Sequence, residues 1–439
     1  MKIRSWLALL GSALVLAACG GGSPECDRST EKGWLQCHMA EWYFWYALAP
    51  RPDPAAYADL DGFFEASLFR GNAEFPADRW SYYESTESFN RFFGDGQNLG
   101  YGLSVAGLEV EGRPDLPLRV RYVEPLSDAA AKGLLRGEQI VSINGVPAST
   151  YIADNDFSVL VPDVAGQTIN LVVRNGAGDR AVTLTATVHA LTPVTGATVL
   201  TSPGGRRVGY LHVKDMINQV NAPLDAAFAL FRAQGVNDVV LDLRYNGGGL
   251  VSVGRTVASY IGGDRSAGRD YVRLLYNDQR AAFNNQTFSF ENPWAAADLA
   301  RVYVLTGPRT CSASEQVING LLPFVTVVQI GDVTCGKPVG FLPQSNAGNT
   351  FSVVAFESVN QNNQGRYWDG LVPTCSVADD LDHPLGSAAE GLLAAALNHA
   401  DTGACPVQAR RAQPLAARGA GRPTKRLAEP GERQGMHAR

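Results

Sequence analysis

The chain has 439 residues, of which 45% are hydrophobic and 18% charged, and its formal net charge at pH 7 is −6. Residues 406–439 carry eight Lys and Arg against two acids, and residues 1–19 carry two more bases. The net charge of the rest of the chain is therefore about −14. An acidic surface of this kind argues against a nucleic-acid partner. With both ends set aside, the chain is long enough for two or three domains.

The N-terminus has the pattern of an exported lipoprotein. Two basic residues precede an apolar stretch over residues 6–16, and a Leu-Ala-Ala-Cys sequence ends at Cys19. We expect residues 1–19 to be a signal peptide and Cys19 to be lipidated, with residues 20–33 as a flexible tether to the membrane. A glycine directly after the lipidated cysteine, as here after Cys19, resembles the pattern of bacterial lipoproteins in the outer membrane. We therefore expect the chain in the cell envelope, facing the periplasm or the cell surface. A cleaved secretory peptide with an incidental cysteine is the alternative.

Residues 34–96 are rich in aromatic side chains and are predicted to form a small helical N-terminal domain. Residues 42–46 are all aromatic, and Phe63, Phe64 and Trp80 follow. Aromatic side chains at this density normally form a core, because each buries a large apolar area. A ligand-binding aromatic platform is the alternative.

Residues 97–193 resemble a PDZ domain. The sequence Gly100-Tyr101-Gly102-Leu103 stands where that domain has its carboxylate-binding loop, and residues 128–145 match its helix, turn and hairpin. The resemblance implies that the backbone N–H groups of this loop bind a peptide C-terminus while the next strand pairs with the peptide. A PDZ fold that only packs or gates is the alternative.

Residues 194–405 alternate strand-like and helix-like runs, which predicts an α/β core. We expect strands over residues 208–213, 238–244, 302–305 and 326–330, and helices over 223–233 and 251–261. The basic tail, residues 406–439, has almost no large apolar side chain and is predicted to be disordered.

Two short segments carry the candidate chemistry: Cys311-Ser312-Ala313-Ser314-Glu315 and Thr334-Cys335-Gly336-Lys337. Ser312 is a candidate nucleophile and Lys337 a candidate base, although a Ser-x-x-Glu sequence is by itself a helix capping box. An Asp-Leu-Arg-x-Asn-x-Gly-Gly strand end, a Ser-Ala-Ser-Glu helix start and a Gly-Lys follow one another here, with 25 residues from serine to lysine. This order resembles the S41 peptidases, the family of the C-terminal processing proteases, as does Asp-Arg-Trp-Ser-Tyr at residues 78–82.

The resemblance implies an α/β fold with the layered sheets and helices of the ClpP and crotonase type. It also implies a serine endopeptidase with a Ser–Lys dyad that acts on polypeptides with free C-termini. Ser312 would attack the scissile carbonyl and Lys337 would take its proton, with Ser314 as the second choice of nucleophile.

The oxyanion hole would combine the Ala313 amide with a glycine amide of residues 247–249. Gly248 is favoured, and Gly249 is the other candidate. Asp242, Arg244 and Asn246, which lead into this turn, are expected to brace it rather than to react.

Lysine accepts a proton only when it is neutral. Lowering its pKa from about 10.4 toward 7 requires roughly 4–5 kcal/mol of desolvation or nearby positive potential, so Lys337 is expected to be buried. A Ser-His-Asp triad built on His212 or His383 is the alternative.

One position departs from the family pattern. Processing proteases commonly have a glutamine four residues after the lysine, where it orients the lysine, and this chain has Phe341 there. Either Gln344 or a backbone group replaces that glutamine, or Lys337 is positioned differently.

Six cysteines remain besides Cys19, and export would place them where disulfides persist. Fifteen connectivities are open, and neighbourhood in the sequence favours three pairs: Cys26–Cys37, Cys311–Cys335 and Cys375–Cys405. None of the spacings is typical of a zinc site, and we expect neither a metal nor a cofactor.

Two further function classes compete with the peptidase. A non-catalytic lipoprotein could use the same fold to capture peptides or other ligands, although the retained Ser312 and Lys337 argue against it. An acyl-CoA enzyme of the crotonase type would share the core fold, but export leaves it without a supply of that cofactor.

Overall fold

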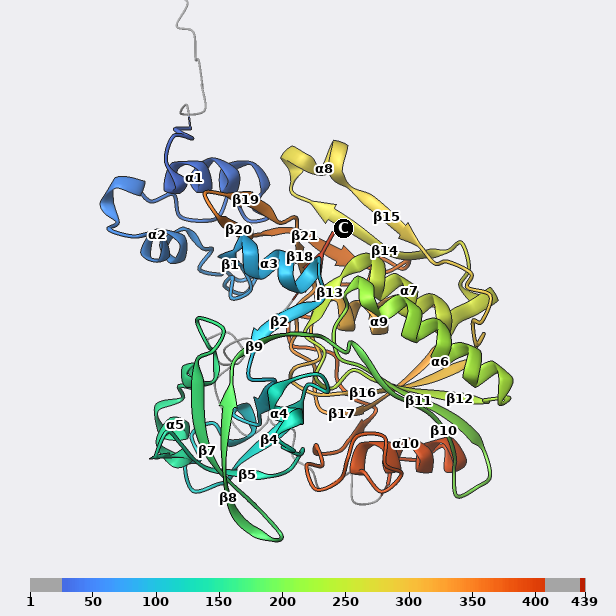
Figure 1. Cartoon of the computed structure of the whole chain (residues 1–439). Coiled ribbons are helices and arrows are strands. Elements are labelled where there is room, and N and C mark those ends of the chain that lie inside the picture. The colour runs from blue at the N-terminus through green and yellow to red at the C-terminus, as the bar shows by residue number, and fades with distance from the viewer. Residues whose placement is uncertain (1–25, 407–434, 439) are drawn as a thin grey trace, which may run out of the picture.

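The computed structural model describes residues 26–406 and 435–438 (Figure 1). The predicted signal peptide with its Cys19, residues 20–25 of the predicted tether and residues 407–434 and 439 of the tail lie outside these residues, while the end of the predicted tether already belongs to the first helix, which begins at Glu31. None of the helices in the described part has the length and hydropathy needed to cross a membrane. The fold is mixed α/β, as expected, and consists of an N-terminal segment, a smaller β-rich unit and a larger unit with two sheets.

The N-terminal segment contains α1 (Glu31–Trp42), α2 (Leu60–Ser67), β1 (Tyr82–Ser85) and α3 (Thr86–Phe93). Each helix begins after a side chain that caps it, because Thr30, Asp59 and Ser85 accept hydrogen bonds from the first turn. The segment is helical as predicted but is not separate from the rest of the chain. Strand β1 pairs antiparallel with β20 (Asn349–Ser352), which pairs with β19 (Gln344–Asn346).

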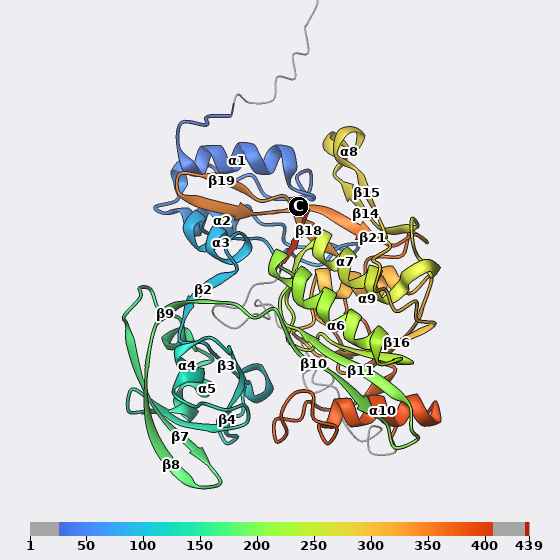
Figure 2. The ribbon, with the colours of Figure 1, turned by 45° about the vertical axis from the view of Figure 1, so that its right-hand side comes forward.

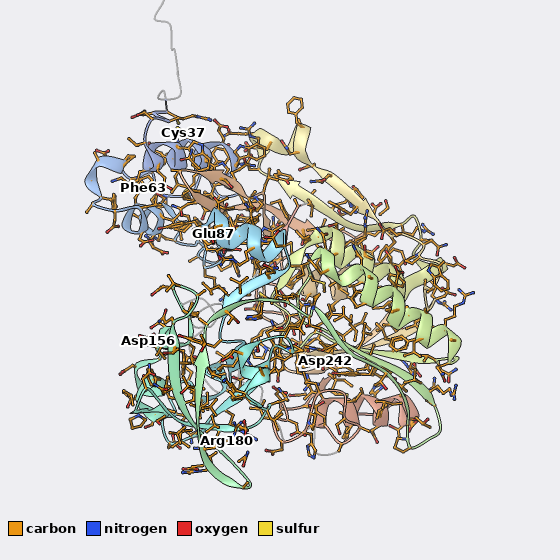
Figure 3. The ribbon with its side chains drawn as sticks, viewed as in Figure 1. Cys37, Phe63, Glu87, Asp156, Arg180 and Asp242 are labelled. Carbon is orange, nitrogen blue, oxygen red and sulfur yellow. A yellow bond between two sulfur atoms is a disulfide. The ribbon has the colours of Figure 1, made fainter. Side chains whose placement is uncertain are left out.

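The aromatic side chains of this segment form a core, as the sequence predicts. Trp45, Phe63 and Trp80 pack in one buried cluster with Phe341 and Phe351 of the larger unit. Figure 3 labels Phe63 and Cys37 on the N-terminal helices. The N-terminal segment therefore covers the part of the larger unit that follows Lys337 in the chain.

The smaller unit has its own core and is joined to the rest by the antiparallel pair β2 (Gln97–Gly100) and β9 (Thr187–Ala190). Its sheet runs in the order β3 (Leu103–Val105), β4 (Leu118–Val123), β5 (Gln139–Ile143), β7 (Thr168–Asn175) and β8 (Gly178–Thr185), with β6 (Val146–Pro147) paired to β5. Two helices, α4 (Asp128–Ala131) and α5 (Ala148–Asp154), complete it. Figure 3 labels Asp156 and Arg180 on this unit.

The first sheet of the larger unit contains the predicted strands. Its order is β10 (Val194–Thr201), β11 (Arg207–Val213), β12 (Asp238–Asp242), β16 (Arg301–Thr306), β17 (Thr326–Gly331) and β22 (Cys375–Ser376), parallel except for β10. Alternate side chains face opposite sides. One face packs against α6 (Asn221–Ala233), α7 (Val251–Gly262) and α9 (Ala313–Leu321), and the other against α10 (Gly391–Thr402) (Figure 2).

The second sheet contains a strand that the sequence does not predict. Its order is β13 (Gly248–Leu250), β23 (Gly435–His437), β18 (Val339–Phe341), β21 (Val354–Val359), β14 (Asp270–Tyr276) and β15 (Gln286–Ser289), with α8 (Asp278–Asn284) between the last two in the chain. Both α7 and α9 lie between the two sheets and share their core. The prediction of a wholly disordered tail is wrong at β23, because Met436 and His437 are fully buried there.

Single turns of 3₁₀ helix connect several of these elements: Pro54–Ala56, Leu108–Val110, Ser158–Leu160, Asn218–Val220 and Gly263–Arg265.

Candidate active site

Ser312 lies in a strained turn between β16 and α9. Its φ is 63° and its ψ is −116°, a conformation that a residue with a side chain rarely adopts. The residue is fully buried, and its Oγ faces the Glu315 N–H in a capping box but makes no hydrogen bond of ordinary geometry within the described residues. Buried hydroxyl groups are normally paired, so this strained, unpaired Oγ at a helix N-terminus fits a nucleophile better than a structural cap.

The carboxylate of Glu315 joins the serine turn to the lysine loop. Its Oε2 accepts hydrogen bonds from the backbone N–H groups of Ser312 and Lys337, both at 2.8 Å. Its Oε1 accepts from the Gly336 N–H at 2.8 Å and from the Thr334 hydroxyl. Burial raises the pKa of Glu315, while these hydrogen bonds act in the opposite direction. The capping-box pattern indicates the first of these bonds, but no sequence signal indicates the other three.

The predicted disulfide Cys311–Cys335 is present, with its Cα atoms 5.1 Å apart. It connects the residue before Ser312 to a residue two positions before Lys337, so it holds the same two segments that Glu315 holds. Both sulfurs are in the bond, so neither is a thiolate that could bind a metal. The predicted pair Cys375–Cys405 is also present, with Cα atoms 5.5 Å apart.

The third predicted pair, Cys26–Cys37, is wrong in this structure, because both residues are free thiols. Cys37 is buried on α1, and Cys26 is exposed on the segment before that helix. Burial and the neighbouring Cys26 thiol raise the pKa of Cys37 to about 11. A thiol with so high a pKa is almost entirely protonated, and the thiolate is the form that enters disulfide exchange.

Lys337 is fully buried, as the requirement for a neutral lysine predicts. Its Nζ lies 3.7 Å from the centroid of the Phe341 ring. The position where relatives commonly have glutamine is therefore in contact with the lysine here, through an aromatic face instead of an amide. Gln344 is exposed on β19, so it does not replace that glutamine.

The glycine turn is braced by the residues expected to brace it. Arg244 is fully buried and forms ion pairs with Asp242 and with Glu390 of the segment before α10. Figure 3 labels Asp242 in the interior of the larger unit. The Asn246 side chain donates to the Val213 carbonyl at 2.9 Å and accepts from the Gly248 N–H at 2.8 Å.

These bonds bear on which glycine could stabilise an oxyanion. The N–H of Gly248, the favoured candidate, donates to the Asn246 side chain of its own turn, and Gly249 is engaged through the pairing of β13 with β23, so Gly249 becomes a free donor only when β23 leaves. Gly248 has a φ of 103°, and a Cβ there would lie 2.9 Å from both the Ala313 nitrogen and the Ser312 Cβ. The turn therefore approaches the serine so closely that only glycine fits at this position.

The other candidate nucleophile and bases are engaged elsewhere. Ser314 Oγ donates to the Asn246 carbonyl at 3.0 Å. His212 is buried on β11 beside the Thr195 hydroxyl, and burial lowers its pKa to about 4. His383 is exposed and lies 2.7 Å from an Asp380 oxygen. Neither histidine bonds to Ser312 Oγ, so the structure does not support a Ser-His-Asp triad.

A cavity of about 120 Å³ lies between the smaller unit and the glycine turn. All four residues of the predicted carboxylate-binding loop, 100–103, line it together with Gly247. Gly102 has a φ of 82°, and a Cβ there would lie 1.9 Å from Ser127 Cβ, so the loop requires glycine at this position.

Charged side chains line the same cavity: Glu124, Lys214, Asp215 and Arg309. Burial raises the pKa of Glu124 to about 7, with Lys214 lowering it and Asp215 raising it further. Glu124 therefore changes charge near neutral pH inside the cavity.

Comparison with known proteins gives consistent matches. The sequence profile of peptidase family S41 matches residues 207–373, and that of the peptidase S41 N-terminal domain matches residues 30–82, together about half of the chain. The chain is 27% identical over 238 residues to a carboxyl-terminal-processing protease of Picosynechococcus sp., a match that covers 54% of each protein. It is 27% identical over 296 residues to a carboxyl-terminal-processing protease of Synechocystis sp., covering 66% of this chain and 65% of the relative. The chain thus spans about half of the first relative's length.

Solved structures give a likeness over more of the chain. A putative S41 protease from Bacteroides fragilis is 26% identical with a TM-score of 0.66, and the match covers 84% of this chain and 97% of that one. A photosystem II D1 C-terminal processing protease, 20% identical with a TM-score of 0.50 and matched over 82% of this chain and 98% of its own, shares the fold.

The Glu315 carboxylate can be tested with Glu315→Gln. An amide nitrogen in place of either oxygen would face N–H or O–H donors and leave them unpaired. We expect a loss of about 2–5 kcal/mol in the free energy of unfolding, measured with urea. Glu87→Gln is the matched control, since Glu87 stands in the first turn of α3 and is exposed, and it should change stability by less than about 0.5 kcal/mol. Equal effects of the two variants would contradict the role given to Glu315.

The two disulfides give a second matched test. Cys311→Ser/Cys335→Ser should lower kcat on a protein substrate by about a hundredfold, because displacements near 1 Å between reacting groups have effects of that size. Cys375→Ser/Cys405→Ser should lower stability while kcat stays within about threefold, because that bond joins β22 to the segment after α10. Similar losses of kcat in both double variants would show that the first bond has no special part in positioning.

Proposed function

Because the chain belongs to peptidase family S41, whose carboxyl-terminal-processing members are serine-type peptidases, we propose that it is an endopeptidase with a Ser312–Lys337 dyad. The observation that supports the dyad most directly is geometric. One carboxylate oxygen of Glu315 binds the backbone N–H groups of both residues at 2.8 Å. Both residues are fully buried, and Ser312 Oγ is unpaired among the described residues.

The proposed reaction follows from these positions. Ser312 Oγ attacks the scissile carbonyl carbon, and its proton passes to Lys337 Nζ. The tetrahedral oxyanion accepts hydrogen bonds from the N–H groups of Ala313 and Gly249, each donor contributing about 3–4 kcal/mol in such sites. Collapse of this intermediate releases the amine, which takes the proton back from Lys337. Water then hydrolyses the acyl-enzyme with Lys337 again as the base.

The ring of Phe341 lies against the ammonium group of Lys337, with Nζ 3.7 Å from its centroid. The face of an aromatic ring attracts an ammonium group weakly compared with a carboxylate, and the ring excludes water. We propose that Phe341 positions Lys337 by contact, where the glutamine of relatives would do so by a hydrogen bond.

We further propose that residues 97–193 act as a PDZ domain that selects polypeptide C-termini. The cavity supports this, because it brings residues 100–103 together with Gly247 of the catalytic turn. A chain end bound in the loop would lie beside the site of cleavage.

We propose that the protein is located in the cell envelope and attached to the membrane through a lipid on Cys19. The sequence pattern over residues 1–19 supports this location. Two disulfides in the larger unit support an oxidising compartment.

The dyad is tested with Ser312→Ala, Lys337→Ala and the double variant on an unstructured protein substrate. Each single change should lower kcat/KM at least about a thousandfold, and the double variant should lose no more, because both residues act in one proton transfer. Ser314→Ala should lose no more than about tenfold, since it removes one hydrogen bond of about 1 kcal/mol. Substantial turnover by Lys337→Ala would refute the lysine base. Tight binding of peptides without cleavage by the unmodified chain would favour a binding protein.

Recognition of chain ends is tested with one peptide bearing a free or an amidated C-terminus. The free form should bind more tightly, and its affinity should rise roughly threefold to tenfold from pH 8 to pH 6, a gain of about 0.7–1.4 kcal/mol. The reason is that Glu124, with a pKa of about 7, loses its negative charge in the cavity as the pH falls. Glu124→Gln should bind with little pH dependence. Equal binding of both peptides would mean that the loop does not read chain ends.

A further inference from the structure

Strand β23, Gly435–His437, lies between β13 and β18 and is parallel to both. Backbone hydrogen bonds join its two ends to these neighbours. The Gly435 N–H donates to the Gly247 carbonyl at 3.0 Å, and the Ala438 N–H donates to the Phe341 carbonyl at 3.1 Å. Within the described part of the chain, β23 links β13 to β18 in the order of the sheet. Figure 1 shows this end of the chain, marked C, beside β13, β18 and β21.

The strand passes directly in front of the serine. A Cβ on Gly248 would lie 2.1 Å from the Gly435 carbonyl oxygen and 2.9 Å from both the Ala313 nitrogen and the Ser312 Cβ. The carbonyl of the tail, the oxyanion amide and the nucleophilic residue therefore surround one point. A substrate must place its scissile carbonyl in this region.

The side chains of Met436 and His437 on β23 are fully buried. Met436 is fully buried in the main core, and its Sδ accepts a hydrogen bond from Gln316 Nε2 at 3.5 Å. Room for its backbone depends on Gly340 of β18, where a Cβ would lie 2.6 Å from the Met436 carbonyl oxygen.

His437 is also fully buried, against three aromatic rings. Its ring centroid lies 4.5 Å from that of Phe93, 5.6 Å from that of Phe89 and 5.5 Å from that of Phe341. Phe341 is the ring that contacts Lys337 Nζ, so the tail and the proposed base contact the same side chain.

Resting on the proposed function, we propose that the segment 435–438 is a removable self-ligand of the substrate channel between β13 and β18. It occupies the place of a polypeptide substrate by adding a strand to both edges, and it holds the site closed until a substrate displaces it. The channel accordingly selects extended polypeptide with a small residue at the place of Gly435, an apolar residue at the place of Met436 and a flat ring at the place of His437.

The selectivity for a small residue has a direct steric basis. A Cβ on Gly435 would lie 3.0 Å from the Gly249 Cα and 2.9 Å from two atoms of the His437 ring. Attachment to the same chain gives the tail an effective concentration in the millimolar range. A free peptide of the same sequence therefore needs a Kd well below a millimolar for the tail to be a true ligand.

The test uses Ser312→Ala chains, so that its readout does not depend on catalysis. The probe is the fluorescent, end-blocked peptide Arg-Gln-Gly-Met-His-Ala, residues 433–438. We expect it to bind the full chain carrying Met436→Asp, and the chain ending at residue 434, with a Kd of about 100 µM or tighter, below the effective concentration of the tail. The Met436→Leu chain keeps an apolar tail and should bind at least about tenfold more weakly. A peptide with aspartate for methionine should not bind.

Two results would overturn the proposal. One is equal, weak binding of the peptide to all three chains. The other is loss of cooperative unfolding in both the Met436→Asp and the shortened chain, which would make β23 a permanent strand of the fold.

Activity separates this proposal from the proposed function. With Ser312 present, Met436→Asp should raise kcat/KM on a protein substrate at least about tenfold over Met436→Leu, as removal of a bound competitor requires. If the peptide binds as expected and no variant cleaves, the peptidase function fails and the self-ligand stands. If both variants cleave equally and the peptide does not bind, the self-ligand fails and the peptidase function stands.

Discussion

The arrangement of the proposed dyad depends on one buried carboxylate, that of Glu315. Its two oxygens accept the backbone N–H groups of Ser312, Gly336 and Lys337, so the nucleophile turn and the base loop are fixed through their main chains. A carboxylate with this many donors offsets the cost of its burial, which an unpaired charge could not do. The disulfide Cys311–Cys335 joins the same segments covalently. The positions of Ser312 and Lys337 are thus fixed through their main chains.

The glycine turn and Phe341 connect this centre to the proposed substrate channel. Gly248 lets the main chain approach Ser312 and Ala313, and the same position faces the Gly435 carbonyl of β23. Phe341 contacts Lys337 Nζ on one side and the ring of His437 on the other. Any strand that replaces the tail would therefore change what covers Phe341 and, through it, the surroundings of the lysine. A strand that fills the proposed channel would thus also alter the surroundings of Lys337, the proposed base.

The sequence singles out Ser312 and Lys337 as the candidate dyad because the family motifs are local and ordered along the chain. The pairs Cys311–Cys335 and Cys375–Cys405 are predictable because the two cysteines of each pair are neighbours in the sequence, and the order of the sheet brings their segments together. Cys26 and Cys37 are also neighbours in the sequence, but both remain thiols. The role of Glu315 extends across more than 20 residues, and only its capping bond is local. Strand β23 is three residues long, too short to show any periodicity in a polar, basic tail.

The central claim, that Ser312 is a nucleophile activated by Lys337, is tested most directly by covalent labelling with a fluorophosphonate probe. The measurement is peptide mapping by mass spectrometry of the labelled chain and of its Met436→Asp and Lys337→Ala variants. The account predicts one adduct, on Ser312, faster in the Met436→Asp chain and lost or strongly slowed in the Lys337→Ala chain. An adduct on Ser314 or on another serine, or equal labelling of Ser312 with and without Lys337, would contradict it.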